Sequence, residues 1–158
     1  MHEMIELDRF DRKLLARLQE DATATNQELG GRIGLSASQV SRRRQRLEAA
    51  RVVRGYHADL DPAALGLTVT AFVGVALATH SRQNARRFHE LVRALPAVQE
   101  AHALTGDMDY MLKVVARDLK ALAALINDEL LPHEAVQNVR SFIALDTLKD
   151  SGQLPIEG

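Results

Sequence analysis

The sequence predicts an α+β chain of two domains, and three observations lead to this prediction. Apolar residues recur with a helical period of about 3.6 from residue 7 to about residue 50. From Leu67 the period falls to two, which is typical of a strand, and helical and extended stretches then alternate. Asp61-Pro62 and Gly66 interrupt the chain between these regions. A length of 158 residues allows one ordinary domain or two small ones, so the change of period marks the boundary.

The first region predicts three helices and a tight turn. An amphipathic helix comes first, with apolar residues at helical spacing: Leu7, Phe10, Leu14, Leu15 and Leu18. A Thr or Ser three residues before Glu or Gln forms a capping box, in which the hydroxyl accepts an unpaired helix N–H group. Thr25 with Glu28 starts a short helix over 26–33, and Ser36 with Gln39 starts a longer one over about 37–50. This cadence, with a turn at Gly34-Leu35, is typical of a helix-turn-helix.

The segment after the third helix predicts a wing. Val52-Val53 followed by Gly55-Tyr56 resembles the start of a strand. The predicted organisation is therefore a winged helix-turn-helix domain over 1–55, a wing and linker over 56–66, a second domain over 67–150 and a loose tail over 151–158.

The second domain predicts two strand-helix-strand units. Their order gives the ferredoxin-like βαββαβ fold. Both faces of the first strand are apolar, so helices should cover one face of the sheet and a second copy of the chain the other. The elements, in order, are a strand over 67–79, a helix over 85–95, strands over 98–104 and 110–116, a helix over 119–130 and a strand over 136–145.

A short basic block coincides with the third predicted helix. Seven Arg and one Glu lie between residues 32 and 54, a net charge of +6 in a chain whose formal charge is −1. An Arg-rich helix can be a solvated face, but a block inside a helix-turn-helix cadence favours binding to double-stranded DNA. Residues 1–31 sum to −3 and residues 55–158 to −4, so the second domain is acidic.

Several residue types are absent, and their absence excludes classes of function. The chain has no Cys, which removes disulfides, Cys-ligated zinc and thiol catalysis. The six His show no paired metal-ligand spacing, and no Gly-rich phosphate loop or nucleophile elbow occurs. The N-terminus is acidic where a signal peptide is basic, and the longest apolar stretch, around 71–78, is far below the ~20 residues that span a bilayer. We therefore expect a soluble, cytoplasmic protein with no membrane contact, cofactor, metal or catalytic residues.

Several stretches together resemble the leucine-responsive and asparagine-operon regulators, the Lrp/AsnC family. The resemblance covers nearly the whole chain and rests on LGGRIGLS (29–36), VSRR (40–43), RLE (46–48), GYHADLD (55–61) and TGDMDY (105–110). It implies a winged helix-turn-helix joined to a ferredoxin-like regulatory module of the RAM or ACT type. It also implies dimers that assemble further into tetramers or octamers, and control of transcription by a small molecule, commonly an amino acid.

Three features depart from the family pattern. Gly30 and Gly31 stand in a helix where the family favours Ala, which suggests close packing because each helical Gly costs about 1 kcal/mol relative to Ala. Arg44 replaces an aliphatic residue, and its stem is expected along the core edge. Arg51 stands where the family usually ends the helix with Gly, which puts the left-handed cap in doubt.

The third helix carries the side-chain types that read DNA. Gln can bond adenine bidentately, Arg can bond guanine, and Ser accommodates either base. We expect four base readers near the helix start: Ser38, Gln39, Ser41 and Arg42. We expect the phosphate contacts to come from Ser36, Arg43, Arg46, Arg51 and Arg54, with Thr25 and Asn26 at the start of the preceding helix.

The loop over 106–110 is the candidate effector site. Its carboxylates could hold an amino acid's ammonium group while N–H groups of the turn take the carboxylate. Alternatively, Gly106 supplies a positive φ and the aspartates merely solvate a hairpin. The resemblance favours an effector loop at a subunit interface, made of Gly106, Asp107, Met108, Asp109 and Tyr110.

Two other functions share this architecture. Siroheme decarboxylases are enzymes of related build, and His57 with Arg54 and Tyr56 would be the local candidate for such chemistry. His57 is more simply explained as a wing residue. An architectural DNA-binding protein would share the basic block but ignore small molecules, so effector dependence separates it from a regulator.

Overall fold

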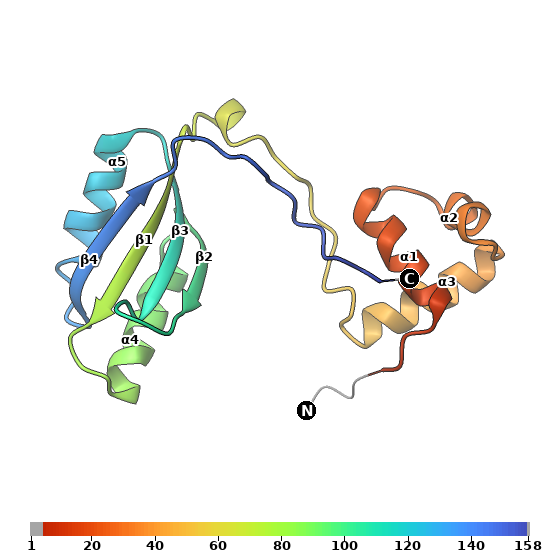
Figure 1. Cartoon of the computed structure of the whole chain (residues 1–158), viewed down its shortest axis with the longest axis horizontal. Helices are drawn as coiled ribbons and strands as arrows, with labels where there is room; N and C mark the ends of the chain where they lie inside the picture. The colour runs from red at the N-terminus through yellow and green to blue at the C-terminus, as the bar shows by residue number, and fades with distance from the viewer. Residues whose placement is uncertain (1–4, 158) are drawn as a thin grey trace. The chain divides into compact units, whose positions relative to one another are not determined.

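The computed structural model describes residues 5–157, which form two compact units (Figure 1). The first unit contains the chain up to Asp59 together with the residues from Lys149 onward, and the second is Leu60–Leu148. Residues 1–4 of the predicted N-terminal domain and Gly158 of the tail lie outside the described residues. Within the described range, no helix is long and apolar enough to cross a membrane.

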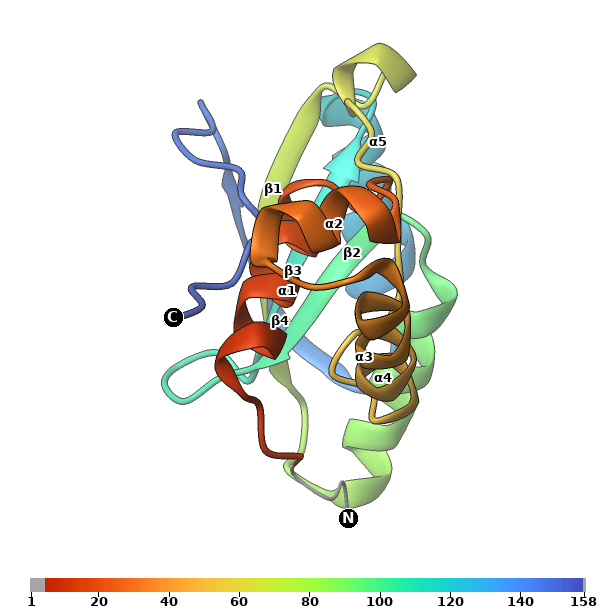
Figure 2. The ribbon, with the colours of Figure 1, turned by 90° about the vertical axis from the view of Figure 1, so that its right-hand side faces the viewer.

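The first unit contains the three predicted helices, which are seen in Figure 2: α1 (Arg9–Glu20), α2 (Asn26–Ile33) and α3 (Ala37–Ala49). Both predicted capping boxes are confirmed, at Thr25 and at Ser36. The turn between α2 and α3 is made by Gly34, whose φ of +79° is a left-handed conformation that glycine adopts without strain. The core that joins the helices consists of Leu14, Leu18, Ala24, Leu29, Ile33, Val40 and Leu47.

Gly30 and Gly31 differ in their surroundings. An added Cβ at Gly30 would overlap the carbonyl oxygen of Leu35, so the close packing expected there is confirmed. At Gly31 nothing lies within 4 Å of such an atom, and the expectation of close packing is wrong for this residue. The α2–α3 turn is therefore packed against one glycine and leaves the other exposed.

The end of α3 retains the left-handed cap that the sequence left in doubt. Arg51 has a φ of +59° and is the one non-glycine residue with positive φ in the described chain. The Val52 N–H donates to the Leu47 carbonyl at 2.9 Å and the Arg51 N–H donates to the Glu48 carbonyl at 3.0 Å, which is the Schellman pattern. A side chain in this conformation costs roughly 1–2 kcal/mol, so Arg51 occupies a strained position.

The predicted wing strand is not formed. The described residues contain no strand before β1 (Val69–Leu77), and residues 54–61 run without regular structure. An extended segment forms a ladder only when a partner strand is available, and this chain offers none there. Tyr56 instead donates a hydrogen bond from its hydroxyl to Glu48 on α3, at 2.7 Å. The segment then enters a short 3₁₀ turn, Ala63–Leu65, before the second unit.

The second unit has the predicted ferredoxin-like order. After β1 come α4 (Arg82–Ala94), β2 (Val98–Ala103), β3 (Tyr110–Ala116), α5 (Leu119–Ala124), its π-helical continuation η2 (Leu125–Leu130) and β4 (Val136–Ile143). The sheet order is β2-β3-β1-β4, with antiparallel neighbours. Both helices cover one face (Figure 1), where Phe88 and Leu130 pack on Val73 and other inward residues of the strands.

No described helix covers the opposite face of the sheet (Figure 1). This face mixes apolar and charged residues, because Lys113 pairs with Phe72 and Arg140 pairs with Gly74. Phe72 on β1 pairs directly with Phe142 on β4, and these side chains are 41% and 51% exposed. Met111 on β3 lies opposite Gly74 and extends the same face. We call this surface, made of Phe72, Met111 and Phe142, the open face.

Residues 151–157 form no helix or strand, and hydrogen bonds attach them to α1. The Gln19 carboxamide on α1 donates to the Leu154 carbonyl at 3.0 Å and accepts from the Leu154 N–H at 2.7 Å. Gln153 adds a bond to the Gln19 carbonyl at 3.3 Å. The polar sequence of the tail gives no sign of this attachment. The carboxamide of Gln19 supplies both the donor and the acceptor for the backbone groups of Leu154.

Candidate functional site

The helix α3 has one buried side and one exposed side. Val40 and Leu47 are fully buried and attach the helix to the core. The exposed side carries Ser38, Arg42 and Gln45, which follow one another at i, i+4 and i+7 and therefore share a face. We call this surface, with the half-buried Ser41 at its edge, the outward face. Its hydroxyl, guanidinium and carboxamide groups can donate to base edges in the major groove.

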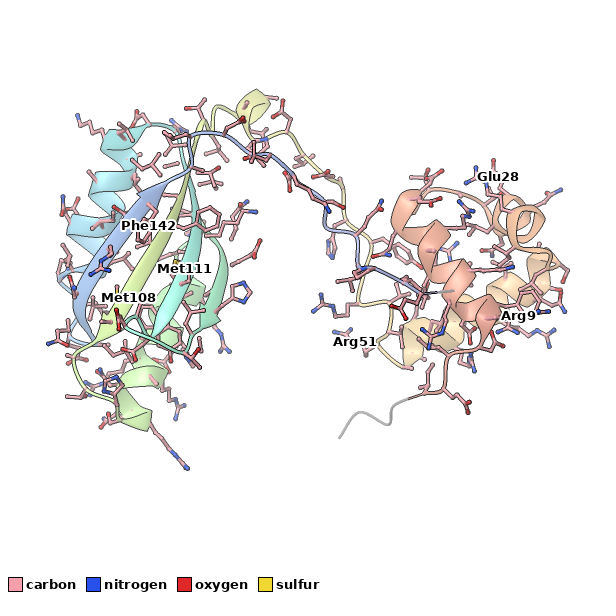
Figure 3. The ribbon with its side chains drawn as sticks, viewed as in Figure 1. Arg9, Glu28, Arg51, Met108, Met111 and Phe142 are labelled. Carbon is pink, nitrogen blue, oxygen red and sulfur yellow. The ribbon has the colours of Figure 1, made fainter. Side chains whose placement is uncertain are left out.

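Three of the predicted DNA contacts are exposed cations. Arg42 lies on the outward face, and Arg51 (Figure 3) and Arg54 follow the end of α3. None of the three makes an ion pair with another described residue. Arg32 on α2 is exposed in the same way. These guanidinium groups are available to DNA phosphates.

Arg43 and Arg46 are placed differently. Arg43 donates at 2.7 Å to Asp8 and at 2.7 Å to Asp11, and its side chain is 25% exposed. Arg46 donates to the other oxygen of Asp11, and its side chain is 50% exposed. Asp11 lies on α1 and is fully buried, while Asp8 caps the start of the same helix. The two cations therefore face α1 and not solvent alone.

The capping side chains are also committed. The Gln39 carbonyl oxygen accepts the Ser36 N–H at 2.9 Å, so its acceptor is occupied and its NH₂ group remains for a base. A bidentate contact to adenine needs both groups, so the oxygen would have to accept the adenine hydrogen with its second lone pair. Ser36 accepts from the Gln39 N–H, and Thr25 accepts from the Glu28 N–H. The Thr25 hydroxyl donates its one hydrogen to Glu28 at 3.0 Å, so it has none left for a phosphate. The Ser36 hydroxyl lies 3.1 Å from that of Ser38, and one hydroxyl of this pair keeps its hydrogen for a phosphate.

Arg44 lies along the core edge, as predicted from its stem. It donates to the side-chain oxygen Oδ1 of Asn26 at 3.0 Å, which leaves the Asn26 NH₂ group as a donor for a phosphate. Its guanidinium carbon also lies 5.2 Å from the centre of the Tyr56 ring, in cation–π range. Burial, together with the Glu48 hydrogen bond, raises the pKa of Tyr56. Tyr56 is thus a packing residue, and His57 beside it is exposed.

The loop over 104–110 presents its residues in different directions. Gly106 has a φ of +122°, a conformation that L side chains rarely adopt, and Asp107 beside it is exposed. The Met108 side chain lies over Gly74, where an added Cβ would come within 3.1 Å of it (Figure 3). The tip of the loop thus combines an exposed carboxylate with a methionine that lies over the internal strand β1.

Asp109 and Tyr110 are held by the fold. The Asp109 carboxylate accepts the Leu77 N–H at 2.7 Å and contacts His80 Nε2 at 2.9 Å. The Leu77 hydrogen bond lowers the pKa of Asp109, and the His80 contact adds to the effect. Tyr110 points to the helix side, where its hydroxyl lies 3.0 Å from His89 Nε2 and its ring packs on Phe88. The five predicted effector residues therefore do not converge on one point within this chain.

The comparisons with known proteins agree over both units. Residues 7–48 match the AsnC-type helix-turn-helix domain, and residues 70–154 match the Lrp/AsnC ligand binding domain. The chain is 38% identical over 152 residues to a leucine-responsive regulatory protein of Rhizobium meliloti, which covers 96% of this chain and 97% of that protein. It is 36% identical to the transcriptional regulator AzlB of Bacillus subtilis, over 97% and 98% of the two chains.

This chain belongs to the Lrp/AsnC family. Among solved structures, the transcriptional regulator NMB0573 of Neisseria meningitidis, solved as a complex with L-Met, superposes with a TM-score of 0.91 at 37% identity. The similarity covers 95% of this chain and 97% of that one. As an Lrp/AsnC protein, the chain is a DNA-binding regulator of transcription and not an enzyme.

Three residues at or beside the candidate DNA surface were not predicted from the sequence: Asp8, Asp11 and Gln45. Asp8 and Asp11 were not expected near α3, because nothing in the sequence shows which face of α1 meets the basic block. Gln45 could have been found, since it follows Arg42 by three residues and Ser38 by seven. In this Lrp/AsnC chain the candidate DNA surface therefore has fewer unpaired arginines than the sequence predicted. It also extends further along α3, as far as Gln45.

Proposed function

We propose that this regulator reads its operator with the outward face of α3, and that an amino acid bound at the 106–108 loop tip modulates that binding. The observation that carries the first part is the alignment of Ser38, Arg42 and Gln45 on the exposed side of a helix whose other side is fixed in the core. Arg51 and Arg54 supply phosphate contacts beside it, Ser36 adds a hydroxyl donor, and Thr25 and Asn26 contribute through the N-terminus of α2.

The test is DNA binding by single variants across a salt series. The probes are an operator selected by the wild-type protein from a random-sequence library and a scrambled duplex of equal length. We expect Arg42→Ala to lose about 1–3 kcal/mol of discrimination between them. Arg54→Ala should weaken both duplexes alike and reduce the salt slope by about 1, because one phosphate is no longer neutralised. Equal binding by wild type and both variants would refute this part.

The effector part is supported by chemistry and by one relative. The Neisseria regulator that this chain resembles was solved with L-Met. The loop offers the exposed Asp107 for an ammonium group and backbone N–H groups beside Gly106 for a carboxylate. Asp109 supports the loop from below through Leu77, so Asp107 is the better candidate for direct contact.

Calorimetric titration with the twenty amino acids tests this part. We expect one or a few to bind, and Asp107→Asn to weaken that binding at least tenfold. Asp146→Asn, an exposed acid in the same unit outside the loop, is the matched control. Absence of binding by every amino acid, or equal affinity in Asp107→Asn and wild type, would contradict it. An architectural protein would bind DNA identically with and without the amino acids.

Self-association is proposed through the open face. Phe72 and Phe142 form an exposed aromatic pair across β1 and the edge strand β4, and exposed apolar surface of this kind marks an interface. Because the face repeats on every copy, two chains can cover each other by a twofold contact. Dimers of this type could assemble further into tetramers or octamers, and we propose that they act in the cytoplasm.

A further inference from the structure

Within the first unit, a charged cluster joins α1 to α3 and consists of Asp8, Asp11, Arg43 and Arg46. Asp11 is the one fully buried charged residue in the described chain. Each of its carboxylate oxygens accepts from a different arginine of α3, and Asp8 accepts from the first of these arginines at 2.7 Å. Four charges of alternating sign thus close a network at the helix junction.

The network has consequences for geometry. Arg43 and Arg46 are about one helical turn apart on α3, and both bind Asp11 on α1. Two contacts at different heights along α3 oppose rotation of this helix about its own axis. Arg43 also lies with its guanidinium 5.5 Å from the centre of the Phe10 ring, which limits its freedom further. The rotation of α3 determines which side chains occupy the outward face.

The network also has consequences for charge. Two of the seven arginines in the basic block are neutralised by two acids outside the block, so the cations left for DNA are fewer than the sequence count indicates. A guanidinium that holds a buried carboxylate would leave that charge unpaired if it moved to a phosphate, and an unpaired buried charge is costly.

We infer that Asp8 and Asp11 are positioning residues for operator recognition: they withhold Arg43 and Arg46 from DNA phosphates and use them to set the rotation of α3. The inference rests on the proposed role of the outward face. It predicts that Arg43 and Arg46 influence which DNA sequence is bound without contributing to the salt dependence of binding. The two acids thus lower the affinity for DNA of any sequence and raise the preference for the operator.

Asp8→Asn is the main test, because Asn caps a helix as well as Asp and Asp8 is half-exposed. The change removes one of the two carboxylates that hold Arg43, so Asp11 alone opposes its movement toward a phosphate. Relative to wild type, we expect the scrambled duplex to bind more tightly, the salt slope to steepen by up to about 0.9 per bound protomer, and the operator preference to fall at least threefold. Asp11→Asn should do the same more strongly if it folds.

Glu20→Gln is the matched control, since it removes the same charge from α1 at a residue that pairs with Arg17 and not with α3. Arg43→Ala should lower operator preference while leaving the salt slope unchanged. The inference is overturned if Asp8→Asn behaves like Glu20→Gln, or if Arg43→Ala flattens the salt slope as much as Arg54→Ala. If wild type shows no operator preference at all, the proposed function fails instead, because the positioning role has nothing to act on.

Discussion

The two units place charged and apolar groups in opposite ways. The helix-turn-helix unit has seven buried apolar residues in its core, and it also buries a carboxylate between α1 and α3. The sheet unit buries thirteen residues in an apolar core and leaves Phe72 and Phe142 exposed on its open face. The first unit is internally satisfied and presents a polar surface, whereas the second is left with an apolar surface to be covered.

This difference assigns DNA recognition to the first unit and self-association to the second. A small helical core fixes which residues are inside but constrains helix rotation weakly, so ionic contacts with defined geometry supply the orientation that DNA recognition needs. A sheet with helices on one side is held by its ladder and core, and its second side is available for self-association. Four experiments test this division, in order of decreasing effect.

The largest effect is expected from Phe142→Arg on the open face. A charge placed in the exposed aromatic pair should weaken self-association at least 30-fold, since an aromatic hot spot of an interface typically contributes about 2 kcal/mol or more. Light scattering after gel filtration measures the assembly. Leu145→Arg, at an apolar residue that is fully exposed beyond the strand, is the control. Unchanged assembly by Phe142→Arg would show that the open face is not the contact.

The second effect compares the two glycines of α2. Gly31→Ala should stabilise the helix-turn-helix unit by about 1 kcal/mol, because nothing opposes the new methyl group. Gly30→Ala should instead destabilise it by about 1–3 kcal/mol, since the added carbon would displace the backbone at Leu35. Urea unfolding followed by circular dichroism measures both. Effects of the same sign would mean that the turn is not packed against Gly30.

The third effect concerns the strained cap of α3. Arg51→Gly should stabilise the unit by about 1 kcal/mol because glycine adopts a positive φ without a Cβ penalty. The same change removes a cation, so the salt slope of DNA binding should fall by about 1 although the protein becomes more stable. Arg54→Gly removes the same charge where φ is not positive, and it should not stabilise. A stabilising Arg54→Gly would contradict the explanation.

The smallest effect is the pH dependence of the α1 cap. The Asp11 N–H, followed by the Arg43 side chain, lowers the pKa of Asp8 below its ordinary value of 3.8. An acid whose pKa is lower in the folded state than in the unfolded state stabilises the fold at pH values above its unfolded-state pKa. This contribution is lost as the pH falls through its folded-state pKa. The stability difference between wild type and Asp8→Asn should therefore be constant above about pH 5 and shrink below about pH 4. A difference that stays constant down to about pH 2.5 would exclude this linkage.

The sequence predicted local structure better than long-range charge pairing. The capping boxes at Thr25 and Ser36 are readable because both partners lie within four residues, and the strands are readable because their period differs from that of the helices. Asp11 belongs to the site for a tertiary reason, since its partners on α3 are 32 and 35 residues away. Arg51 could not be placed from sequence because the preference for Gly at a left-handed cap is statistical, and here the backbone hydrogen bonds prevail.

The docking of the tail on Gln19 makes the helix-turn-helix unit discontinuous in the chain. The regulatory unit is inserted between Asp59 and Lys149, and both of its ends lead back to the same unit. The regulatory unit is therefore an insertion in the helix-turn-helix unit. A truncation that removes the regulatory unit also removes the C-terminal segment of the helix-turn-helix unit. A fluorescent group attached at Ser151 would therefore report on α1, although in sequence it follows the last strand of the regulatory unit.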